Sequence, residues 1–144
     1  MKICNHKGLS VVIMLRDEHC PPHAHAHVEA GTWSARFRFS FWHNGVELWD
    51  VVPLSRRPPL AVLEGLRQSL QQPAHLRRAR GIWWRKLQTA CLDNQLWDWQ
   101  SNEVVVVKRV VSTTNMIGSA CYEPESNKTL LSLIGAQEGV EIEL

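Results

Sequence analysis

Hydrophobic and polar positions alternate along much of the first third of the chain. Residues 9–15 are rich in β-branched side chains, which favours a strand. Residues 23–28 and 33–41 repeat with a period of two, so each segment places its apolar side chains on one face of a strand. Residues 46–52 follow Asn44-Gly45, a dipeptide typical of tight hairpins, and form the returning strand. The pattern predicts consecutive antiparallel strands at the N-terminal end.

The period then changes to that of a helix. Leu60, Leu63, Leu66 and Leu70 recur at helical spacing, and Pro73 ends that helix. A second helix is predicted over residues 75–92, with a buried stripe formed by Leu76, Ala79, Trp83, Leu87 and Ala90.

Strand patterns return after the helices. Residues 103–111 form a long β-branched run, and residues 119–123, 129–134 and 140–144 show weaker strand patterns. Strands, then two amphipathic helices, then further antiparallel strands indicate an α+β fold. We expect one domain over residues 1–144, with residues 93–144 as a C-terminal β extension of the part formed by residues 9–92.

The alternating pattern also predicts a register for the first hairpin. If residues 29–32 hold the turn, the alanines of the first strand face apolar residues of the second. The same register pairs His27 with Ser34, His25 with Arg36 and His23 with Arg38. A shift by one residue would turn every aromatic side chain towards solvent, so the register is well specified. One sheet face is therefore expected to carry histidines and arginines.

Three interpretations of this polar face remain open. Alternate histidines such as His23 and His25 lie roughly 6.5–7 Å apart along a strand, which suits two ligands of one zinc or other transition-metal ion. His19, His27, Cys20 or Glu18 would complete such a site. Against a metal, positive charge on Arg36 and Arg38 would repel a dication and suit an anion better. The third interpretation is a solvated face of a half-buried sheet.

The run Glu18-His19-Cys20-Pro21-Pro22-His23-Ala24-His25 resembles a known signature. A widespread bacterial family of small proteins, known only as a domain of unknown function, carries Asp-His-x-Pro-Pro-His-x-His near its N-terminus. The resemblance covers residues 9–86, with Glu18 where the family usually has aspartate. It implies a bacterial or phage-borne protein associated with toxin–antitoxin systems or mobile elements, and it implies no ligand or activity.

The charges are unevenly distributed, although the net charge is only +2. Between Arg56 and Lys86 there are eight basic residues and one acid, which suggests an acidic partner. Basic and aromatic side chains together are typical of surfaces that bind nucleic acids. The candidate residues for binding a nucleic acid or another anion are Arg36, Arg38, Arg77, Arg80, Trp84 and Arg85.

The cysteines and apolar runs bear on location. Four scattered cysteines contain no Cys-x-x-Cys pair, and no apolar run reaches the ~20 residues of a membrane span. Residues 9–15 are too short for a signal peptide and run directly into charged residues. We therefore expect a cytoplasmic protein with reduced thiols and no membrane partner.

Competing functions follow from these observations. No complete catalytic set is visible, which favours a non-enzymatic, toxin–antitoxin-like regulatory protein that binds a protein partner or a nucleic acid through its basic helix and its His/Arg face. The alternative is a metal-dependent hydrolase or nuclease that uses the histidine strand, with Glu18 as base or orienting group. A homo-oligomer whose histidines tune a pH-sensitive surface is a third hypothesis.

Overall fold

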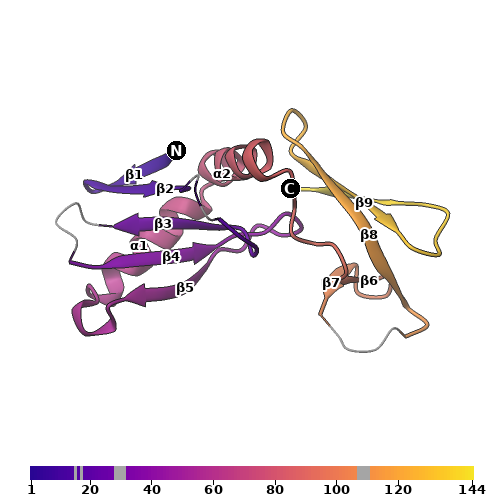
Figure 1. Ribbon diagram of the computed structural model, residues 1–144, viewed down its shortest axis with the longest axis horizontal. Helices are drawn as coiled ribbons and strands as arrows, with labels where there is room; N and C mark the ends of the chain where they lie inside the picture. The colour runs from indigo at the N-terminus through magenta and orange to yellow at the C-terminus, as the bar shows by residue number, and fades with distance from the viewer. Residues whose placement is uncertain (15, 17, 28–31, 107–110) are drawn as a thin grey trace. The chain divides into compact units, whose positions relative to one another are not determined.

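The computed structural model describes residues 1–14, 16, 18–27, 32–106 and 111–144. The chain divides into two compact units, which are described separately (Figure 1). The N-terminal unit comprises Met1–Ser40 and Asn44–Gln88, and the C-terminal unit comprises Phe41–His43 and Thr89–Leu144. The expectation of a single domain over the whole chain stays a prediction.

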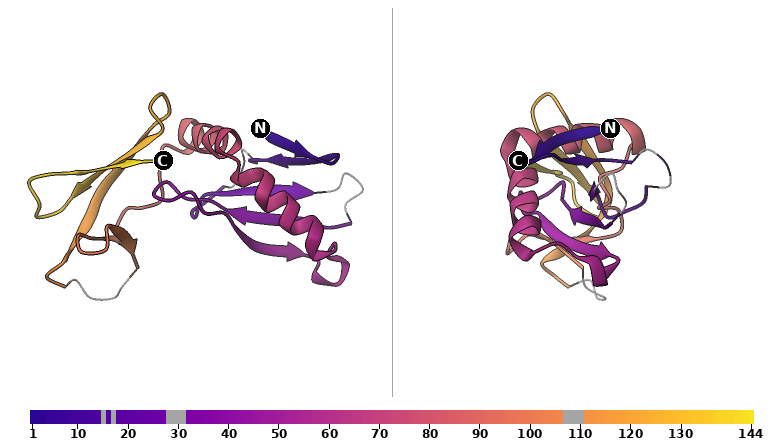
Figure 2. Two further views of the ribbon diagram at one scale, coloured as in Figure 1. Left: turned by 180° about the vertical axis from the view of Figure 1, so that it is seen from behind. Right: turned by 90° about the vertical axis from the view of Figure 1, so that its left-hand side faces the viewer.

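The N-terminal unit is an antiparallel sheet followed by two helices. Its five strands lie in chain order across the sheet: β1 (Lys2–His6), β2 (Leu9–Val12), β3 (His23–His27), β4 (Ser34–Arg38) and β5 (Glu47–Val52). A 3₁₀ turn, η1 (Leu54–Arg56), leads to α1 (Leu60–Gln71) and α2 (Pro73–Leu87). Helix α1 crosses the sheet, as the reverse view shows (Figure 2).

The core of this unit lies between the helices and the apolar face of the sheet. Ala24, Ala26, Ala35 and Phe37 on β3 and β4 are completely buried. The buried leucines of α1, which are Leu63, Leu66 and Leu70, and Trp83 of α2 also belong to this core, and the Trp83 ring reaches to 5.5 Å from that of His23. The other face of β3 and β4 is left for the histidines and arginines.

The predicted register of the first hairpin is confirmed. His23 pairs with Arg38, His25 with Arg36 and His27 with Ser34. Val28 and residues 29–31 of the proposed turn lie outside the described residues. Burial of the alternating apolar residues explains the register, because a slip would expose Phe37.

Several features differ from the sequence prediction. The tight Asn44-Gly45 turn does not form, and residues 39–46 connect β4 to β5 instead. Tertiary partners outweigh the local preference here: Asn44 Oδ1 accepts a hydrogen bond from Arg80 at 2.8 Å, and the Val46 amide donates to Gln71 at 3.2 Å. Strand β1 was not predicted.

The second helix also has other bounds than predicted. It begins at Pro73, because proline is well suited to the first helical position. It ends at Leu87, since Gln88 adopts the left-handed conformation with φ of 55°. Strand β2 ends at Val12 before the predicted limit, and Leu15 lies outside the described residues.

The C-terminal unit contains a second antiparallel sheet in the order β10-β9-β8-β6-β7. Its strands are β6 (Leu96–Asp98), β7 (Glu103–Val105), β8 (Thr114–Glu123), β9 (Lys128–Leu133) and β10 (Val140–Glu143). Tyr122 is buried against Phe41 with ring centroids 5.1 Å apart. Strand β6 was not predicted, and residues 107–110 of the predicted long strand lie outside the described part.

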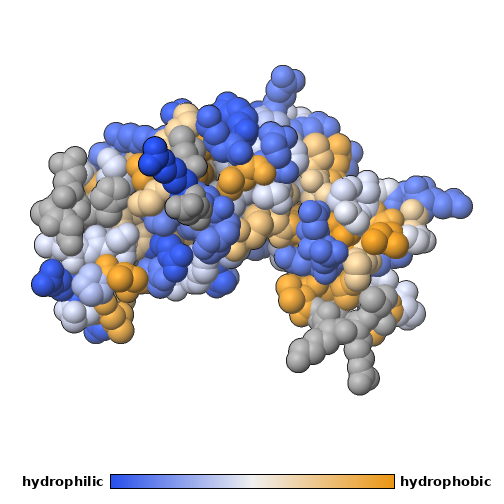
Figure 3. Space-filling model, in the orientation of Figure 1, coloured by the Kyte–Doolittle hydropathy of each residue, from blue (hydrophilic) through white to orange (hydrophobic). Residues whose placement is uncertain are grey.

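The α+β class is confirmed, with strands, two helices and further antiparallel strands in that order. Within the described residues, neither helix has the length and apolar character needed to cross a membrane. Apolar surface remains over the end of β5, where Val52 and Leu54 are exposed (Figure 3).

The helix-to-sheet packing predicts a large effect of truncating Leu66. Leu66 is completely buried on α1, whereas Leu60 at the start of the same helix is 75% exposed. We expect Leu66→Ala to lower the free energy of unfolding by about 2–5 kcal/mol, because it removes buried methyl groups and leaves a cavity. Urea titration followed by tryptophan fluorescence measures this change. Leu60→Ala is the matched control, and equal effects of the two variants would contradict the packing described above.

Candidate metal centre

Three side chains that could hold a metal ion meet beside β3. Glu18, His23 and His25 each offer one ligand atom, and these atoms all lie within 4.8 Å of one another. Among the described residues this is a compact His-His-Glu cluster, and we call it the triad. Two histidines and one carboxylate form a donor set that suits zinc and other divalent transition metals.

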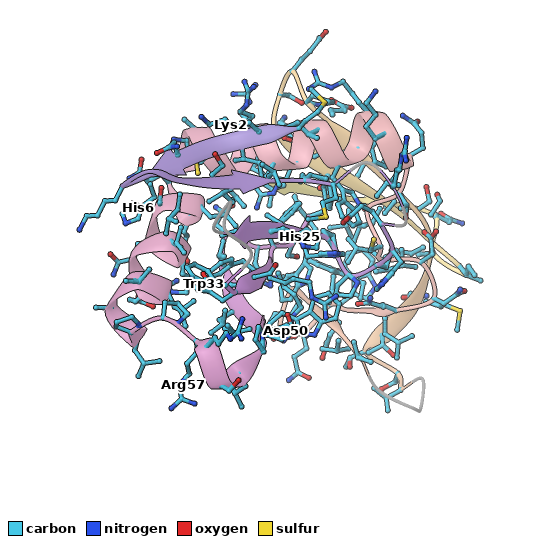
Figure 4. The ribbon with its side chains drawn as sticks, turned by 60° about the vertical axis from the view of Figure 1, so that its left-hand side comes forward. Lys2, His6, His25, Trp33, Asp50 and Arg57 are labelled. Carbon is cyan, nitrogen blue, oxygen red and sulfur yellow. The ribbon has the colours of Figure 1, made fainter. Side chains whose placement is uncertain are left out.

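The backbone explains how the triad assembles. His23 and His25 are two residues apart on β3, so both imidazoles lie on the same sheet face, with ring centroids 5.0 Å apart. Ahead of the strand, the Pro22 carbonyl accepts a hydrogen bond from the Phe39 amide at 3.0 Å, which continues the pairing with β4. The preceding segment returns Glu18 to the two rings. Figure 4 labels His25 on its strand.

The triad is almost completely buried. The side chain of Glu18 is 4% exposed, that of His23 2% and that of His25 12%. Burial disfavours charged forms, so it raises the pKa of Glu18 and lowers the pKa of His23. Each group is therefore biased towards its neutral form. A bound cation would stabilise the charged carboxylate of Glu18 and so counteract the effect of burial on its pKa.

A hydrogen bond sets the tautomer of His23. Its Nδ1 lies 2.8 Å from the Pro21 carbonyl oxygen, which can only accept, so Nδ1 carries the proton. In the neutral imidazole, Nε2 then presents a lone pair. That lone pair faces Glu18 Oε2 at a distance of 3.0 Å.

The carboxylate of Glu18 also has an atom without a hydrogen-bond partner. Glu18 Oε2 is buried and makes no hydrogen bond to any described residue, although His23 Nε2 lies so close. Glu18 Oε1 lies 3.2 Å from His25 Nε2. Two lone pairs at this separation repel each other unless a proton or a cation lies between them. A proton on Glu18, which burial favours, or a bound cation would remove this repulsion.

The arginines of β4 do not oppose a cation in the way that the sequence suggested. Arg36 donates two hydrogen bonds to Asp50 of β5, one of them from Nε at 2.8 Å. Arg38 donates to Glu47 at 2.8 Å. Each positive charge is paired with a carboxylate, so the repulsion of a dication at the triad is reduced. The hydrogen bonds from Arg36 also lower the pKa of Asp50.

A bulge between β4 and β5 brings Trp49 into the same surroundings. The register shifts between Arg36 and Phe37, so an extra residue enters β5 at this point. The Trp49 ring lies 5.2 Å from that of His23, and the Arg36 guanidinium stands 4.1 Å above its centroid. The ring therefore lies beside His23 and holds Arg36 by a cation–π contact.

The other predicted ligands lie outside the triad. His19 is exposed, and its Nδ1 lies 3.0 Å from the Cys20 carbonyl oxygen. The side chain of His27 is outside what the structure describes. Cys20 is disulfide-bonded and offers neither a thiolate ligand nor a nucleophile, so the prediction of reduced thiols is wrong there. Disulfides persist mainly in oxidising compartments, and the cysteines therefore no longer support a cytoplasmic location.

The predicted basic surface is only partly present. Arg80 was expected beside Arg77 and Trp84, but it is 1% exposed and donates to Ser40 and Asn44, so it is wrong as a surface anion ligand. Internal carbonyl partners explain its burial. Arg77 and Arg85 are exposed, and Trp84 is half-buried.

Sequence reasoning missed Asp50 and Trp49. Asp50 was detectable in principle, because it lies opposite Arg36 once β4 and β5 are paired. Trp49 was not, since only the bulge turns it towards His23. Comparison of the chain with protein-family models, with curated proteins and with solved structures finds no match.

The Arg36–Asp50 pair predicts a change in acid stability. Because the folded pKa of Asp50 is depressed, its contribution is present at neutral pH and is lost as the pH falls through that pKa. We expect Asp50→Asn to destabilise the protein at neutral pH and to approach wild-type stability in acid. Urea midpoints measured across the pH range test this. Since Asp50 is 33% exposed, the difference should be modest, and a difference independent of pH would contradict the assignment.

Proposed function

We propose that this protein is a metal-dependent hydrolase whose divalent transition-metal ion, such as zinc, is held by Glu18, His23 and His25. The observation that carries the proposal is the unsatisfied pair of Glu18 Oε2 and His23 Nε2, which are buried 3.0 Å apart. A buried carboxylate oxygen without a hydrogen bond is unfavourable by about 1–3 kcal/mol. Coordination of one cation would satisfy both atoms.

The donor set supports catalysis as well as binding. Structural zinc sites close their coordination shell with four protein ligands, whereas catalytic sites use three and leave a position for water. A metal ion with an open position lowers the pKa of its water and so supplies a nucleophile at neutral pH.

Each residue has a distinct role in this proposal. His23 binds through Nε2 in a tautomer that Pro21 sets. His25 binds through its own Nε2, which already faces the carboxylate. Glu18 is a ligand here, which is one of the roles that the sequence offered, and not the base or orienting group.

The binding hypothesis based on the basic helix has less support. It keeps the exposed Arg77 and Arg85, but Arg80 is buried, and Arg36 and Arg38 are paired with acids. The resemblance to a bacterial family of small proteins adds no activity to either hypothesis. We therefore favour the hydrolase.

Metal binding is the first expected outcome. Titration calorimetry with Zn²⁺ should show one site in the wild-type protein, and Glu18→Gln should weaken binding by about 100-fold or more, because it removes a charged ligand. Glutamine has nearly the same shape, so folding should be retained, and circular dichroism checks this. His23→Ala should also lose the site.

His19→Ala is the matched control for the metal titration. It removes a neighbouring histidine that lies outside the triad, so we expect wild-type affinity. Zn²⁺ binding that survives Glu18→Gln but fails in His19→Ala would contradict the assigned ligand set.

Hydrolysis is the second expected outcome. Zn²⁺-loaded protein should cleave activated nitrophenyl esters of carboxylic or phosphoric acid, because coordination activates water. Chelation or Glu18→Gln should reduce the rate to that of buffer. The absorbance of released nitrophenolate measures the rate of cleavage. A protein that binds zinc tightly and cleaves neither class of ester would contradict the hydrolase and leave a structural metal site.

A further inference from the structure

Each metal-binding histidine has an arginine beside it on the next strand. His25 pairs with Arg36 and His23 pairs with Arg38 in the β3–β4 register. Residues directly opposite in an antiparallel pair have Cβ atoms about 4.5–5.5 Å apart and project from the same face. The two arginines therefore lie on the same sheet face as the histidines, one strand away.

The two arginines differ in how many of their donors form hydrogen bonds. Arg36 donates two hydrogen bonds to Asp50 and lies over Trp49 at 4.1 Å, so it is held by its neighbours. Arg38 donates one hydrogen bond to Glu47, and its side chain is 43% exposed. Its Nε atom is nevertheless buried and finds no hydrogen-bond partner among the described residues.

An unused donor on a charged group is unusual, because a buried N–H without an acceptor is unfavourable. The Nε and Nη groups of arginine form a planar fork that matches two oxygens of an oxyanion. The Glu47 contact involves only Nη2. Arg38 thus retains a donor suited to a further acceptor, next to His23.

The net charge of the metal-loaded site also favours binding of an anion. The Arg36–Asp50 and Arg38–Glu47 pairs are each neutral, and a divalent ion beside the single carboxylate of Glu18 leaves net positive charge. That charge favours an anion in the open coordination position. A tetrahedral phosphoryl group can give one oxygen to the metal ion and others to the arginine fork, which a carboxylate with two oxygens cannot do as well.

We propose that the substrates of this site are phosphate esters, with Arg38 binding the phosphoryl oxygens beside the metal ion. This inference rests on the proposed metal-dependent hydrolase and adds its substrate class. Arg38 is a substrate-binding residue in this scheme, and Arg36 is a positioning residue that keeps Trp49 and Asp50 in place.

The test is a titration of Zn²⁺-loaded protein with inorganic phosphate, with acetate as the comparison anion. We expect phosphate to bind more tightly than acetate, and Arg38→Gln to weaken phosphate binding about tenfold or more while Zn²⁺ affinity stays unchanged. Arg38→Lys retains the charge but loses the fork, so its phosphate affinity should fall between those of the wild-type protein and Arg38→Gln. Equal phosphate affinity of the wild-type protein and Arg38→Gln would overturn the inference.

Arg67→Gln is the matched control, because Arg67 also forms an arginine–glutamate pair, with Glu64 on α1, but lies on another element. It should bind phosphate like the wild-type protein. The two proposals fail in different ways. Absence of Zn²⁺ binding overturns the proposed function itself. Zn²⁺ binding and carboxylic-ester cleavage without phosphate binding overturn only the substrate class.

Discussion

The pairing of β3 with β4 is the constraint on which the rest of the N-terminal unit depends. Its apolar face consists of small alanines and Phe37, all completely buried beneath the helices. Because side chains alternate along a strand, this single choice of register places His23, His25, Arg36 and Arg38 on the opposite face. The hydrophobic core and the polar cluster are therefore two consequences of one alignment.

Burial away from water determines which protonation states the triad favours. In water, a histidine and a glutamate side by side would form a weak ion pair. Burial instead biases both His23 and Glu18 towards neutrality, while the Pro21 carbonyl keeps the His23 lone pair directed at the carboxylate. The site thereby fits the shared cation that we propose, and the surrounding Arg–Asp and Arg–Glu pairs keep the nearby arginine charge balanced.

Much of this arrangement follows from short-range pattern. The α+β order, the hairpin register, the break before Pro73 and the shared face of His23 and His25 all depend on period-two or helical spacing between near neighbours. Features decided by distant partners were not predictable. In place of the Asn44-Gly45 turn, Asn44 accepts a hydrogen bond from Arg80 and the Val46 amide donates one to Gln71, and Arg80 itself is buried.

By itself, the sequence determined which residues share a face, because alternation along a strand is a local geometric property. Only the tertiary structure decided which of the polar residues meet. It selected Glu18 over His19 as the third member of the triad, since the path of the chain ahead of β3 brings one side chain inward and leaves the other exposed. It also supplied Asp50 and Trp49, which reach the site through pairing with β5 and a bulge in that strand. Contacts between segments far apart in the chain have no periodic signature, and that is why they required the fold.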